Sequence, residues 1–251
     1  MTGPEFSIVV PCHNEEGNLP PLVEAIDRVL SPLEVEYEVV ITDDRSSDRS
    51  WEVLQELAQR NPRVRGQRLR ENRGESAASW AGMQLARGRY IVTMDADLQN
   101  DPEDLPRFID GLKQADCVCG SRVESRGEGD HIIRIASSRI ANWVRNALSG
   151  EEISDAGCTY RAFRRECIGN LKYFRGMHRF LPTLFKIEGY SVIEIPVANN
   201  PRLYGSAHYG VWNRLFASFH DLLAVRWMKS RMVPFEVEER IGGETDDPGR
   251  R

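Results

Sequence analysis

Apolar, β-branched runs alternate with helical patterns from Phe6 to Gly120. The alternation is typical of a mostly parallel sheet that is covered by helices on both faces. It therefore predicts an α/β fold. The expected strands are Phe6–Val10, Tyr37–Thr42, Val64–Leu69, Tyr90–Met94 and Asp116–Gly120, and a later strand is expected within Gly189–Val197.

Turn and capping residues give the expected helix boundaries. The first helix is expected to end at Leu30, and the third near Arg87–Gly88. Ser47 or Asp48 is expected to cap the second helix, because short polar side chains accept hydrogen bonds from the first turn. The run Asp101-Pro102-Glu103 is expected to open the fourth helix, since proline is favoured at a first helical position.

Length and composition limit the organisation and the class of protein. The chain has 251 residues, enough for one well-buried domain, which we expect over 1–228 with amphipathic helices at about 128–149 and 209–228. A basic segment and a disordered acidic tail are expected over 229–251. The net charge of -5 argues against nucleic acid as the main partner.

Targeting signals and cysteines bear on the compartment. The N-terminus lacks a basic region followed by an apolar one, and no run of about 18 apolar residues occurs, so neither a signal peptide nor a spanning helix is expected. Five cysteines without framework spacing indicate a reducing compartment, and Cys117 and Cys119 are expected in the core. We expect a cytoplasmic protein, free or peripheral on the cytoplasmic face of a membrane.

The stretch Arg89–Glu103 carries the strongest chemical signal. Its apolar strand ends in two carboxylates one residue apart, Asp95 and Asp97, and Gln99 adds a neutral oxygen. In open α/β sheets ligands bind at the carboxyl ends of strands, where an acidic pair suits a divalent cation that carries phosphate oxygens. A capping Asp and a turn before the next helix would give the same letters, so the motif alone leaves both readings open.

Nucleotide-binding loops of the common glycine-rich kinds are absent, because neither GxGxxG nor a P-loop occurs. A nucleotide would therefore be held by side chains and a metal. Asp155 is followed by the small residues Ala156 and Gly157, which is expected to leave its carboxylate accessible, although the residues alone favour a cap or an Asx turn. The loop containing Arg202 is able to close over phosphate or simply to connect two elements.

Two amphipathic segments allow two readings each. The stretch Arg122–Arg145 is rich in arginine among apolar residues, and a stripe from Trp212 to Leu223 recurs at helical spacing before a cluster of cations. Such patterns form core-facing or solvated surface helices, and they also form helices that lie against an anionic lipid surface. A peripheral membrane contact is thus one expectation, and a separate membrane protein that brings the lipid is the other.

Several motifs in fixed order resemble the family 2 glycosyltransferases, in particular the dolichyl or polyprenyl-phosphate sugar synthases, which include dolichol-phosphate mannosyltransferase. The motifs are VVPCHNEEGNL, VVITDDRSSD, ENRGESAASWAGMQLARG, YIVTMDADLQNDPE, CGSR, SRIAN, DAGCTYRAF and RLYG. The resemblance extends from about Phe6 to Arg226. It implies a GT-A nucleotide-sugar-binding fold, and an inverting, metal-dependent transfer of a hexose-type sugar from a UDP- or GDP-sugar to a polyprenyl phosphate.

The resemblance also implies roles for residues of the first two loops. Pro11, His13 and Glu15 match positions that hold the nucleotide base and ribose, with His13 in place of the usual Tyr. Asp44 matches the Asp of a DDGS-type motif that touches the base. These four residues are the expected base-side part of the donor site.

At the fourth strand, the resemblance implies that Asp95, with Ala96 beside it, contacts the nucleotide. Asp97 and Gln99 match the ligands of a Mg²⁺ or Mn²⁺ ion that bridges the diphosphate. The implied metal set is therefore Asp97 and Gln99.

Cationic and acidic positions complete the implied site. Arg122, Arg202 and His208 match positions that hold donor or acceptor phosphates, and Asp155 matches an acidic position proposed as base or acceptor-positioning group. Asp97, Asp155 and Arg202 form the expected catalytic set. A phosphate monoester with a second pKa near ~6 is already dianionic at neutral pH, so Asp155 is expected to position the acceptor more than to remove a proton.

The chain departs from the family pattern in two places. Arg45 stands where DDGS has Gly, which changes the backbone freedom of that loop. In the RxxGxSKY loop, Ala207 and His208 replace Ser and Lys, so a fixed cation becomes one that titrates near neutrality.

Two other functions use the same features. One keeps the donor and changes the acceptor to a soluble glycan or protein; in that branch processive synthases carry QxxRW, where this chain has Leu223 in place of Gln. The other is a module that binds a nucleotide sugar without turnover. Retention of the Asp95, Asp97 and Gln99 set argues against the module, whereas the altered Ala207-His208 loop leaves it open.

Overall fold

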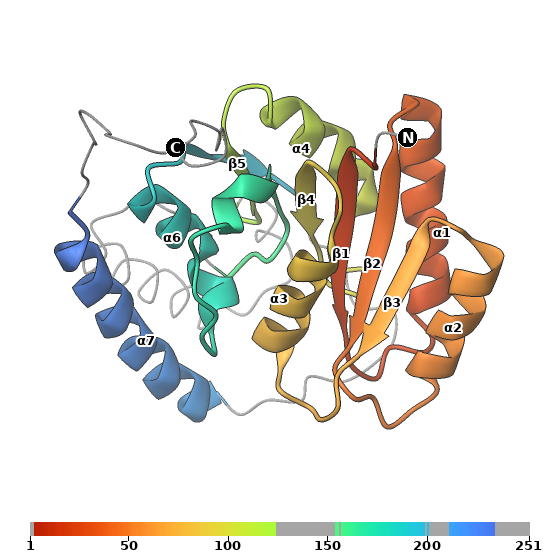
Figure 1. Ribbon diagram of the computed structural model, residues 1–251, viewed down its shortest axis with the longest axis horizontal. Helices are drawn as coiled ribbons and strands as arrows, with labels where there is room; N and C mark the ends of the chain where they lie inside the picture. The colour runs from red at the N-terminus through yellow and green to blue at the C-terminus, as the bar shows by residue number, and fades with distance from the viewer. Residues whose placement is uncertain (1–2, 124–153, 156, 199, 201–210, 234–251) are drawn as a thin grey trace, which may run out of the picture.

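A seven-stranded sheet forms the centre of the molecule (Figure 1). The computed structural model describes residues 3–123, 154–155, 157–198, 200 and 211–233, with the backbone alone over 211–219. The strands are β1 (Phe6–Cys12), β2 (Tyr37–Asp43), β3 (Val64–Arg68), β4 (Tyr90–Thr93), β5 (Cys117–Ser121), β6 (Arg161–Arg164) and β7 (Val192–Pro196). Their order in the sheet is β3-β2-β1-β4-β6-β5-β7.

The sheet is mostly parallel, as the alternating pattern predicts. β6 pairs antiparallel with both β4 and β5, whereas the β1–β2, β1–β4, β2–β3 and β5–β7 pairs are parallel. All seven residues of β2 are buried, which agrees with an apolar run that is covered on both faces. The expected α/β class is therefore confirmed.

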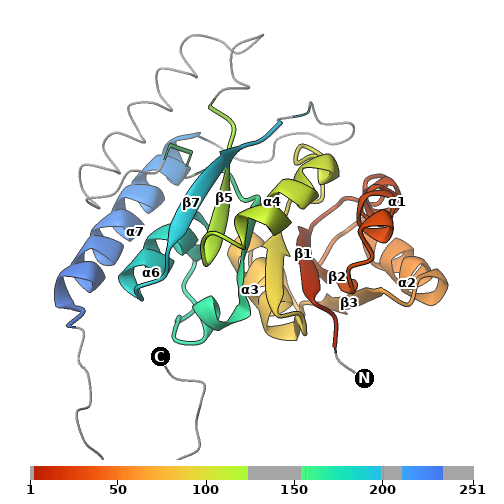
Figure 2. The ribbon, with the colours of Figure 1, turned by 90° about the horizontal axis from the view of Figure 1, so that it is seen from above.

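Helices cover both faces of this sheet. Figure 2 shows α1, α2 and α4 on one side and α3, α6 and α7 on the other. The α-helices are α1 (Leu19–Leu30), α2 (Ser50–Arg60), α3 (Glu75–Leu85), α4 (Leu105–Gly111), α6 (Leu181–Ile187) and α7 (Val211–Arg231). Short 3-10 turns lie at η1 (Ser31–Leu33), η2 (Pro102–Asp104), η3 (Arg165–Ile168) and η4 (Met177–Phe180).

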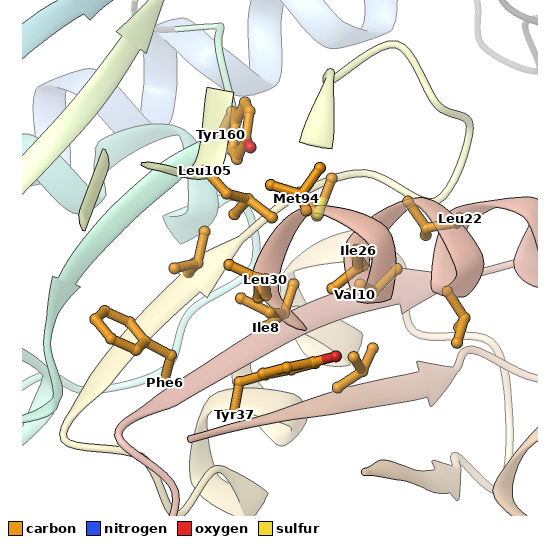
Figure 3. Packing of buried hydrophobic residues seen from close by; sticks show 14 of the residues in the cluster. Phe6, Ile8, Val10, Leu22, Ile26, Leu30, Tyr37, Met94, Leu105 and Tyr160 are labelled. Carbon is orange, nitrogen blue, oxygen red and sulfur yellow. The ribbon is translucent and has the colours of Figure 1, made fainter. Parts of the chain in front are cut away.

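A separate apolar cluster lies on each face. On one face, α1 places Leu22, Ile26 and Leu30 at helical spacing against Ile8 and Val10 of β1 (Figure 3). On the other, α3, α6 and α7 contribute Met83, Leu184 and Leu222, which pack with Val9 and Ile91. Alternate residues of β1 thus point into opposite cores, as the two-residue period of a strand requires.

Two predicted helix boundaries need correction. The N-cap position of α2 is Arg49 rather than Ser47 or Asp48, although Asp48 still accepts the Ser50 N–H at 3.0 Å through Oδ1. The third helix ends at Leu85, before the predicted Arg87–Gly88. The Arg87 N–H donates to Glu38 at 2.7 Å and the Gly88 N–H to Ser7 at 2.8 Å, so strand side chains replace the helical acceptors.

Two other expectations, on Asp101 and on the cysteines, are confirmed. Asp101 caps η2 by accepting the Glu103 N–H at 3.0 Å. All five cysteines are buried and free, and Cys117 and Cys119 lie in the core on β5. Among the described residues, no helix is both long enough and apolar enough to cross a bilayer. The predicted helix at 128–149 and most of the 229–251 tail lie outside the described residues.

The order of the strands reverses beside β1. β2 and β3 follow on one side of β1, whereas β4 lies on its other side. At such a switch point the loops that leave the carboxyl ends of neighbouring strands diverge and leave room for a ligand. The loops after β1, β2 and β4 carry most of the predicted donor-site residues, while Pro11 lies in β1 and Arg122 follows β5.

Candidate active site

Asp95 lies two residues after the end of β4 and is fixed by two polar contacts. Thr159 Oγ1 donates to Asp95 Oδ2 at 2.7 Å, and the Asp95 N–H donates to Asn100 Oδ1 at 2.9 Å. Thr159 is fixed in turn, because its carbonyl accepts Thr93 Oγ1 at 2.7 Å. Burial and then the nearby Asp97 carboxylate raise the pKa of Asp95, and the Thr159 hydrogen bond opposes this rise. Asp95 is therefore an oriented carboxylate in an environment that disfavours its charge.

Asp97 and Gln99 are joined by a tight turn. The Gln99 N–H donates to Asp97 Oδ1 at 3.1 Å, and Leu98 between them has φ +61°. A left-handed conformation is costly for a bulky residue and tends to occur at functional sites. Gln99 also contacts Asn200, whose carbonyl accepts Gln99 Nε2 at 3.4 Å and whose N–H donates to the Gln99 carbonyl at 3.0 Å.

The Asp97 turn suits a hard divalent cation. A carboxylate and an amide oxygen are ligand types of Mg²⁺, which commonly keeps its other positions for water and phosphate oxygens. Asp97 is buried, with 6% of its surface exposed, so a cation there would face little competing solvent. Within the described part of the chain, no group of three or more His, Cys, Asp or Glu residues is placed to hold a metal.

Ala96 differs from its neighbours. Its side chain is buried and belongs to the apolar cluster beneath β1 and β4. Only its backbone is therefore able to contact a donor, which narrows the predicted role of this residue.

Arg122 and Asp155 form a buried ion pair. Arg122 Nε donates to Asp155 Oδ2 at 2.8 Å and Nη2 donates to Oδ1 at 3.3 Å. The Asp155 side chain is 2% exposed, so the prediction of an accessible carboxylate is wrong. The cause is Arg122, which covers the carboxylate that the small neighbours would otherwise leave open. Although burial lowers the pKa of Arg122, hydrogen bonding to Asp155 gives a net rise.

The side chain of Glu194, on β7, holds the backbone of the Asp155 segment in place. Glu194 accepts the Ser154 N–H at 3.0 Å and the Asp155 N–H at 3.3 Å. The Arg122 charge also reaches Asp95, because it is among the groups that lower the Asp95 pKa. Arg122, Asp155 and Asp95 thus belong to one electrostatic environment.

The base-side residues meet between the loops after β1 and β2. His13 Nδ1 lies 3.1 Å from the Asp44 carbonyl oxygen, and Asn72 Nδ2 lies 3.3 Å from the same ring nitrogen. Glu15 Oε2 accepts Asn18 Nδ2 at 2.5 Å, at the start of α1. The structure therefore brings His13 and Asp44 together and places Glu15 at the adjoining helix start.

Asp44 has a structural task that the sequence did not predict. Its two oxygens accept the N–H groups of Arg73 and Gly74, each at 2.7 Å. The carboxylate thereby fixes the loop that opens α3. Arg45, next to it, has φ +59°, a left-handed conformation that glycine would adopt without strain.

A pocket borders Asp95 on the side of α3 and β6. Pro11 and Asp95 both line it, and its other polar lining residues are Glu75, Ser79, Thr93, Thr159, Arg161 and His178. The structure thus brings Pro11 and Asp95 together. Arg202, Ala207 and His208 lie outside the described residues, so their predicted phosphate contacts stay predictions.

Sequence reasoning missed most of the groups that surround Asp95. Thr159 and Arg161 lie in the CTYRAF stretch, where Thr159 precedes β6 and Arg161 begins it among buried residues, and this signal could have marked them. Asn100, 1% exposed, stands in the DLQND run with its carboxamide turned back to Asp95. His178 gives no local signal, because it reaches the pocket only through the packing of η4 on α3.

The comparison with known families agrees with this arrangement. The family model "Glycosyl transferase family 2" matches residues 7–171, which run from the second residue of β1 to beyond β6 and include the loops after β1, β2, β4 and β5. The chain belongs to glycosyltransferase family 2. The resemblance that the motifs carry is thereby confirmed.

Curated relatives share most of this chain. An undecaprenyl-phosphate 4-deoxy-4-formamido-L-arabinose transferase of Edwardsiella ictaluri (strain 93-146) is 35% identical over 218 residues, which are 86% of this chain and 66% of that protein. The protein of the same name from Pseudomonas paraeruginosa (strain DSM 24068 / PA7) is 35% identical over 238 residues, 94% of this chain and 68% of its own length. The chain spans about two thirds of the length of these relatives.

Solved structures confirm the GT-A fold. Glucosyl-3-phosphoglycerate synthase from Mycobacterium tuberculosis, in complex with Mn²⁺, UDP-glucose and phosphoglyceric acid, matches with a TM-score of 0.65 at 16% identity, over 92% of this chain and 81% of that one. Mannosyltransferase PcManGT from Pyrobaculum calidifontis, in complex with GDP-Man and Mn²⁺, matches with a TM-score of 0.60 at 17% identity. The match covers 91% of this chain and 64% of that one.

Proposed function

We propose that this chain transfers a sugar from a UDP- or GDP-linked donor to a polyprenyl phosphate, with inversion at the anomeric carbon. The observation that carries the proposal is the pair Asp95 and Asp97 at the end of β4, oriented by Thr159 and Gln99, in a family 2 chain. The relatives named as undecaprenyl-phosphate sugar transferases support a lipid phosphate as acceptor.

The base-side loops hold the nucleotide in this proposal. Pro11, His13 and Glu15 line one side, and the loop fixed by Asp44 closes the other. The contact of His13 with the Asp44 carbonyl supports this assignment, because it orients an imidazole at the edge where a base would stack. Asp95 and the backbone of Ala96 reach the ribose and diphosphate from β4.

Asp97 and Gln99 would hold Mg²⁺ or Mn²⁺. The bound ion would neutralise charge on the donor diphosphate. Asp97 supplies the carboxylate for it, and the turn through Leu98 fixes the direction in which Gln99 presents its amide. The two similar solved structures named above contain Mn²⁺, which supports this choice of cation.

Arg122, Arg202 and His208 act on phosphate groups in the proposal. Arg122 is held by Asp155, which makes Asp155 a positioning residue for that guanidinium. The acceptor phosphate is dianionic near neutrality and needs little help from a base. Its oxygen attacks the anomeric carbon as the bond to the leaving diphosphate breaks, and cations on both sides stabilise the separating charge.

An exposed surface of α7 is the proposed membrane contact. Its apolar residues include Trp227, which is 62% exposed, and Val233, just after the helix, which is 78% exposed. Exposed cations lie among them at Arg226, Lys229 and Arg231. Aromatic and basic side chains on one helix favour the interface of an anionic bilayer. A separate membrane protein that occupies this surface is the other possibility.

Release of nucleoside diphosphate tests the proposed reaction. A panel of UDP- and GDP-sugars is offered with Mg²⁺ or Mn²⁺, with and without a short polyprenyl phosphate. We expect release that requires both metal and lipid phosphate, and a loss of at least about a hundredfold in Asp97→Ala. Asp110→Ala, at a carboxylate that is 71% exposed, is the matched control. Metal-dependent donor binding without lipid-stimulated release from any donor would contradict the proposal.

Flotation with vesicles tests the membrane contact. Trp227→Glu is expected to weaken binding to vesicles that contain anionic lipid, because it replaces the largest exposed apolar side chain of α7 with a like charge to the lipid. Tyr173→Glu, at a 42% exposed aromatic outside α7, serves as the control. If wild type and Trp227→Glu bind the vesicles equally, the α7 surface is not the membrane contact, and a protein partner becomes the expected occupant.

A further inference from the structure

Glu194 is the charged residue of β7, which lies at one edge of the sheet. A charge on an edge strand commonly prevents pairing with the strand of another chain. Glu194 has a further contact, because both of its oxygens accept the Ser154 N–H at 3.0 Å and Oε1 also accepts the Asp155 N–H at 3.3 Å. Ser154 lies 40 residues before Glu194 in the chain. The carboxylate therefore fixes where a distant segment lies against β7.

The segment that Glu194 holds carries the carboxylate of the buried ion pair. Asp155 accepts from Arg122 Nε at 2.8 Å, from Nη2 at 3.3 Å and from the Arg122 backbone N–H at 3.3 Å. The Asp155 carbonyl accepts the Cys158 N–H at 3.1 Å, which closes the turn. The Arg122 side chain is 19% exposed and that of Asp155 is 2% exposed. Arg122 is thus the member of the pair that a ligand reaches.

The order of the strands places Arg122 on one side of the donor carboxylates. Arg122 directly follows β5, and the order β1-β4-β6-β5 puts β5 two strands from β4, on the side away from β1. Since neighbouring strands lie about 4.8 Å apart, the ends of β4 and β5 are separated by about 10 Å. In the proposed reaction the acceptor phosphate attacks from the side opposite the leaving diphosphate. Arg122 lies on that side, because the base-side residues belong to β1 and the loops after β1 and β2.

We propose that Glu194 is a positioning residue for the acceptor phosphate. It holds the backbone of Ser154 and Asp155, Asp155 holds the Arg122 guanidinium, and the guanidinium meets the phosphate. The inference rests on the proposed function, since it concerns the acceptor of that reaction. Glu194 contributes by ordering the guanidinium in advance, so that binding of the phosphate does not have to restrict a free arginine side chain.

Steady-state kinetics with a short polyprenyl phosphate test this role. Glu194→Ala removes the contacts to both N–H groups, so we expect the KM for the lipid phosphate to rise about tenfold. The dissociation constant of free UDP or GDP with Mn²⁺ should stay within about twofold, because those ligands bind at β1, β2 and β4. Glu194→Gln keeps an oxygen in the place of Oε1, which contacts both N–H groups, and should bring the KM back to within about threefold of wild type.

Asp116→Ala is the matched control. Asp116 Oδ2 accepts the Ser191 N–H at 2.9 Å and its Oδ1 accepts Arg164 Nε at 3.0 Å, so it also joins a backbone segment and an arginine. It precedes β5 at the amino end of that strand, away from the site. Asp116→Ala should lower the melting temperature and leave the KM for the lipid phosphate unchanged. If Glu194→Ala likewise changes only the melting temperature, Glu194 is a structural residue and the inference is overturned.

A double-mutant cycle tests the route through Arg122. In the Arg122→Ala background, adding Glu194→Ala should change the remaining kcat/KM for the lipid phosphate by less than about twofold. Equal losses in the two backgrounds would overturn the inference, and so would a fall in nucleotide affinity as large as the rise in KM. Glu194→Asp, whose shorter side chain withdraws the carboxylate from the segment, provides the same comparison if Glu194→Ala fails to fold.

Calorimetry with the short polyprenyl phosphate separates this inference from the proposed function. If wild type releases no nucleoside diphosphate from any donor, the proposed function fails. Binding of the lipid phosphate that is about tenfold weaker in Glu194→Ala than in wild type and Asp116→Ala would still support the positioning role. Equal binding by all three proteins would overturn that role, and a wild type that binds no lipid phosphate would overturn both proposals.

Discussion

Asp95 carries an electrostatic cost at the end of β4. Burial first, and repulsion from Asp97 second, raise its pKa above the ordinary value of an aspartate. The folded chain therefore holds the Asp95 proton to a higher pH than the unfolded chain does. The free energy of unfolding therefore falls as pH rises from the pKa of Asp95 in the unfolded chain through its higher pKa in the folded chain. At neutral pH the ionised Asp95 carboxylate destabilises the folded state.

Asp95→Asn should consequently stabilise the protein while removing its activity. The amide keeps an oxygen that accepts from Thr159 but carries no charge. At pH 7 we expect the melting temperature to rise by about 2–4 °C, the shift that roughly 1 kcal/mol produces in a chain of this size. The gain should shrink as pH falls toward about 4, where the wild-type carboxyl in the unfolded chain also becomes neutral. Melting curves from pH 4.5 to 8 measure this, with the exposed Asp110→Asn as control; a gain independent of pH would contradict the argument.

Arg45 offers a second test at the residue scale. It is exposed and has φ +59°, which costs a non-glycine residue about 1–2 kcal/mol. Glycine avoids that strain but adds about 0.5–1 kcal/mol of entropy to the unfolded chain. Because the first magnitude is larger, Arg45→Gly should raise the free energy of unfolding by about 0.5–1 kcal/mol, measured in urea. Arg60→Gly, in the last turn of α2, should instead lower it, and equal losses in both would exclude backbone strain at Arg45.

Individual site residues were predictable where the signal is local. Asp95, Asp97 and Gln99 follow a recognisable strand within six residues, so their shared position could be inferred from the sequence. The pairing of Asp155 with Arg122 could not, because it joins segments far apart in the chain and turns an expected open carboxylate into a buried one. The loop containing Arg202 remains a prediction.

At the scale of elements, α3 contributes to both the core and the site. Its first turn carries Glu75 and Ser76, while Gly82, one turn before its end, rests on β1. A Cβ at Gly82 would lie 2.6 Å from Val9 Cγ1 and 3.2 Å from Thr42 Oγ1. The absence of a side chain at Gly82 therefore lets α3 lie close to the sheet, which sets the height of Glu75 above the pocket.

Gly82→Ala tests this close packing. Alanine improves helix propensity by about 1 kcal/mol, but crowding in a filled core costs about 1–3 kcal/mol. Since Val9 is fully buried and has little room to move, we expect a net loss of about 1–2 kcal/mol in urea unfolding. Gln84→Ala on the exposed face of α3 should be neutral or slightly stabilising. Val9→Ala should cost less in the Gly82→Ala background than in wild type; additive losses would rule out this contact as the cause.

The elements were more predictable than their directions. Apolar runs flanked by polar loops mark β1, β2, β4 and β5 as strands, whereas β3 (VRGQR) has Val64 as its one apolar residue. β6 has only the residues Arg161–Arg164, and nothing in that short segment states that it runs antiparallel between β4 and β5. A long stretch of chain separates β6 from β5, so neighbouring residues do not predict where β6 lies. The positions of Thr159 and Arg161 in the site follow from that of β6.

For the molecule as a whole, ligand binding and folding are linked. The proposed donor site draws residues from the loops after β1, β2 and β4, and these residues are brought together only in the folded chain. A nucleoside diphosphate with Mn²⁺ at 100 times its dissociation constant should add about 2.7 kcal/mol of stability and raise the melting temperature by about 5–10 °C. UDP and GDP tested separately would identify the base from the larger shift.

Removing the metal, or replacing its proposed ligand Asp97, should abolish this rise in melting temperature. With a chelator in place of Mn²⁺, the diphosphate loses its counter-charge and faces Asp95 and Asp97 directly, so little stabilisation should remain. Asp97→Ala should behave like the chelated wild type, whereas Asp110→Ala should keep the full shift. Asp97 is buried, and its carboxylate repels that of Asp95 two residues earlier. Its removal relieves this repulsion, so the ligand-free Asp97→Ala variant should melt at or above the wild-type temperature. A lower ligand-free temperature together with a retained Mn²⁺ shift would mean that Asp97 stabilises the turn and that the cation binds elsewhere.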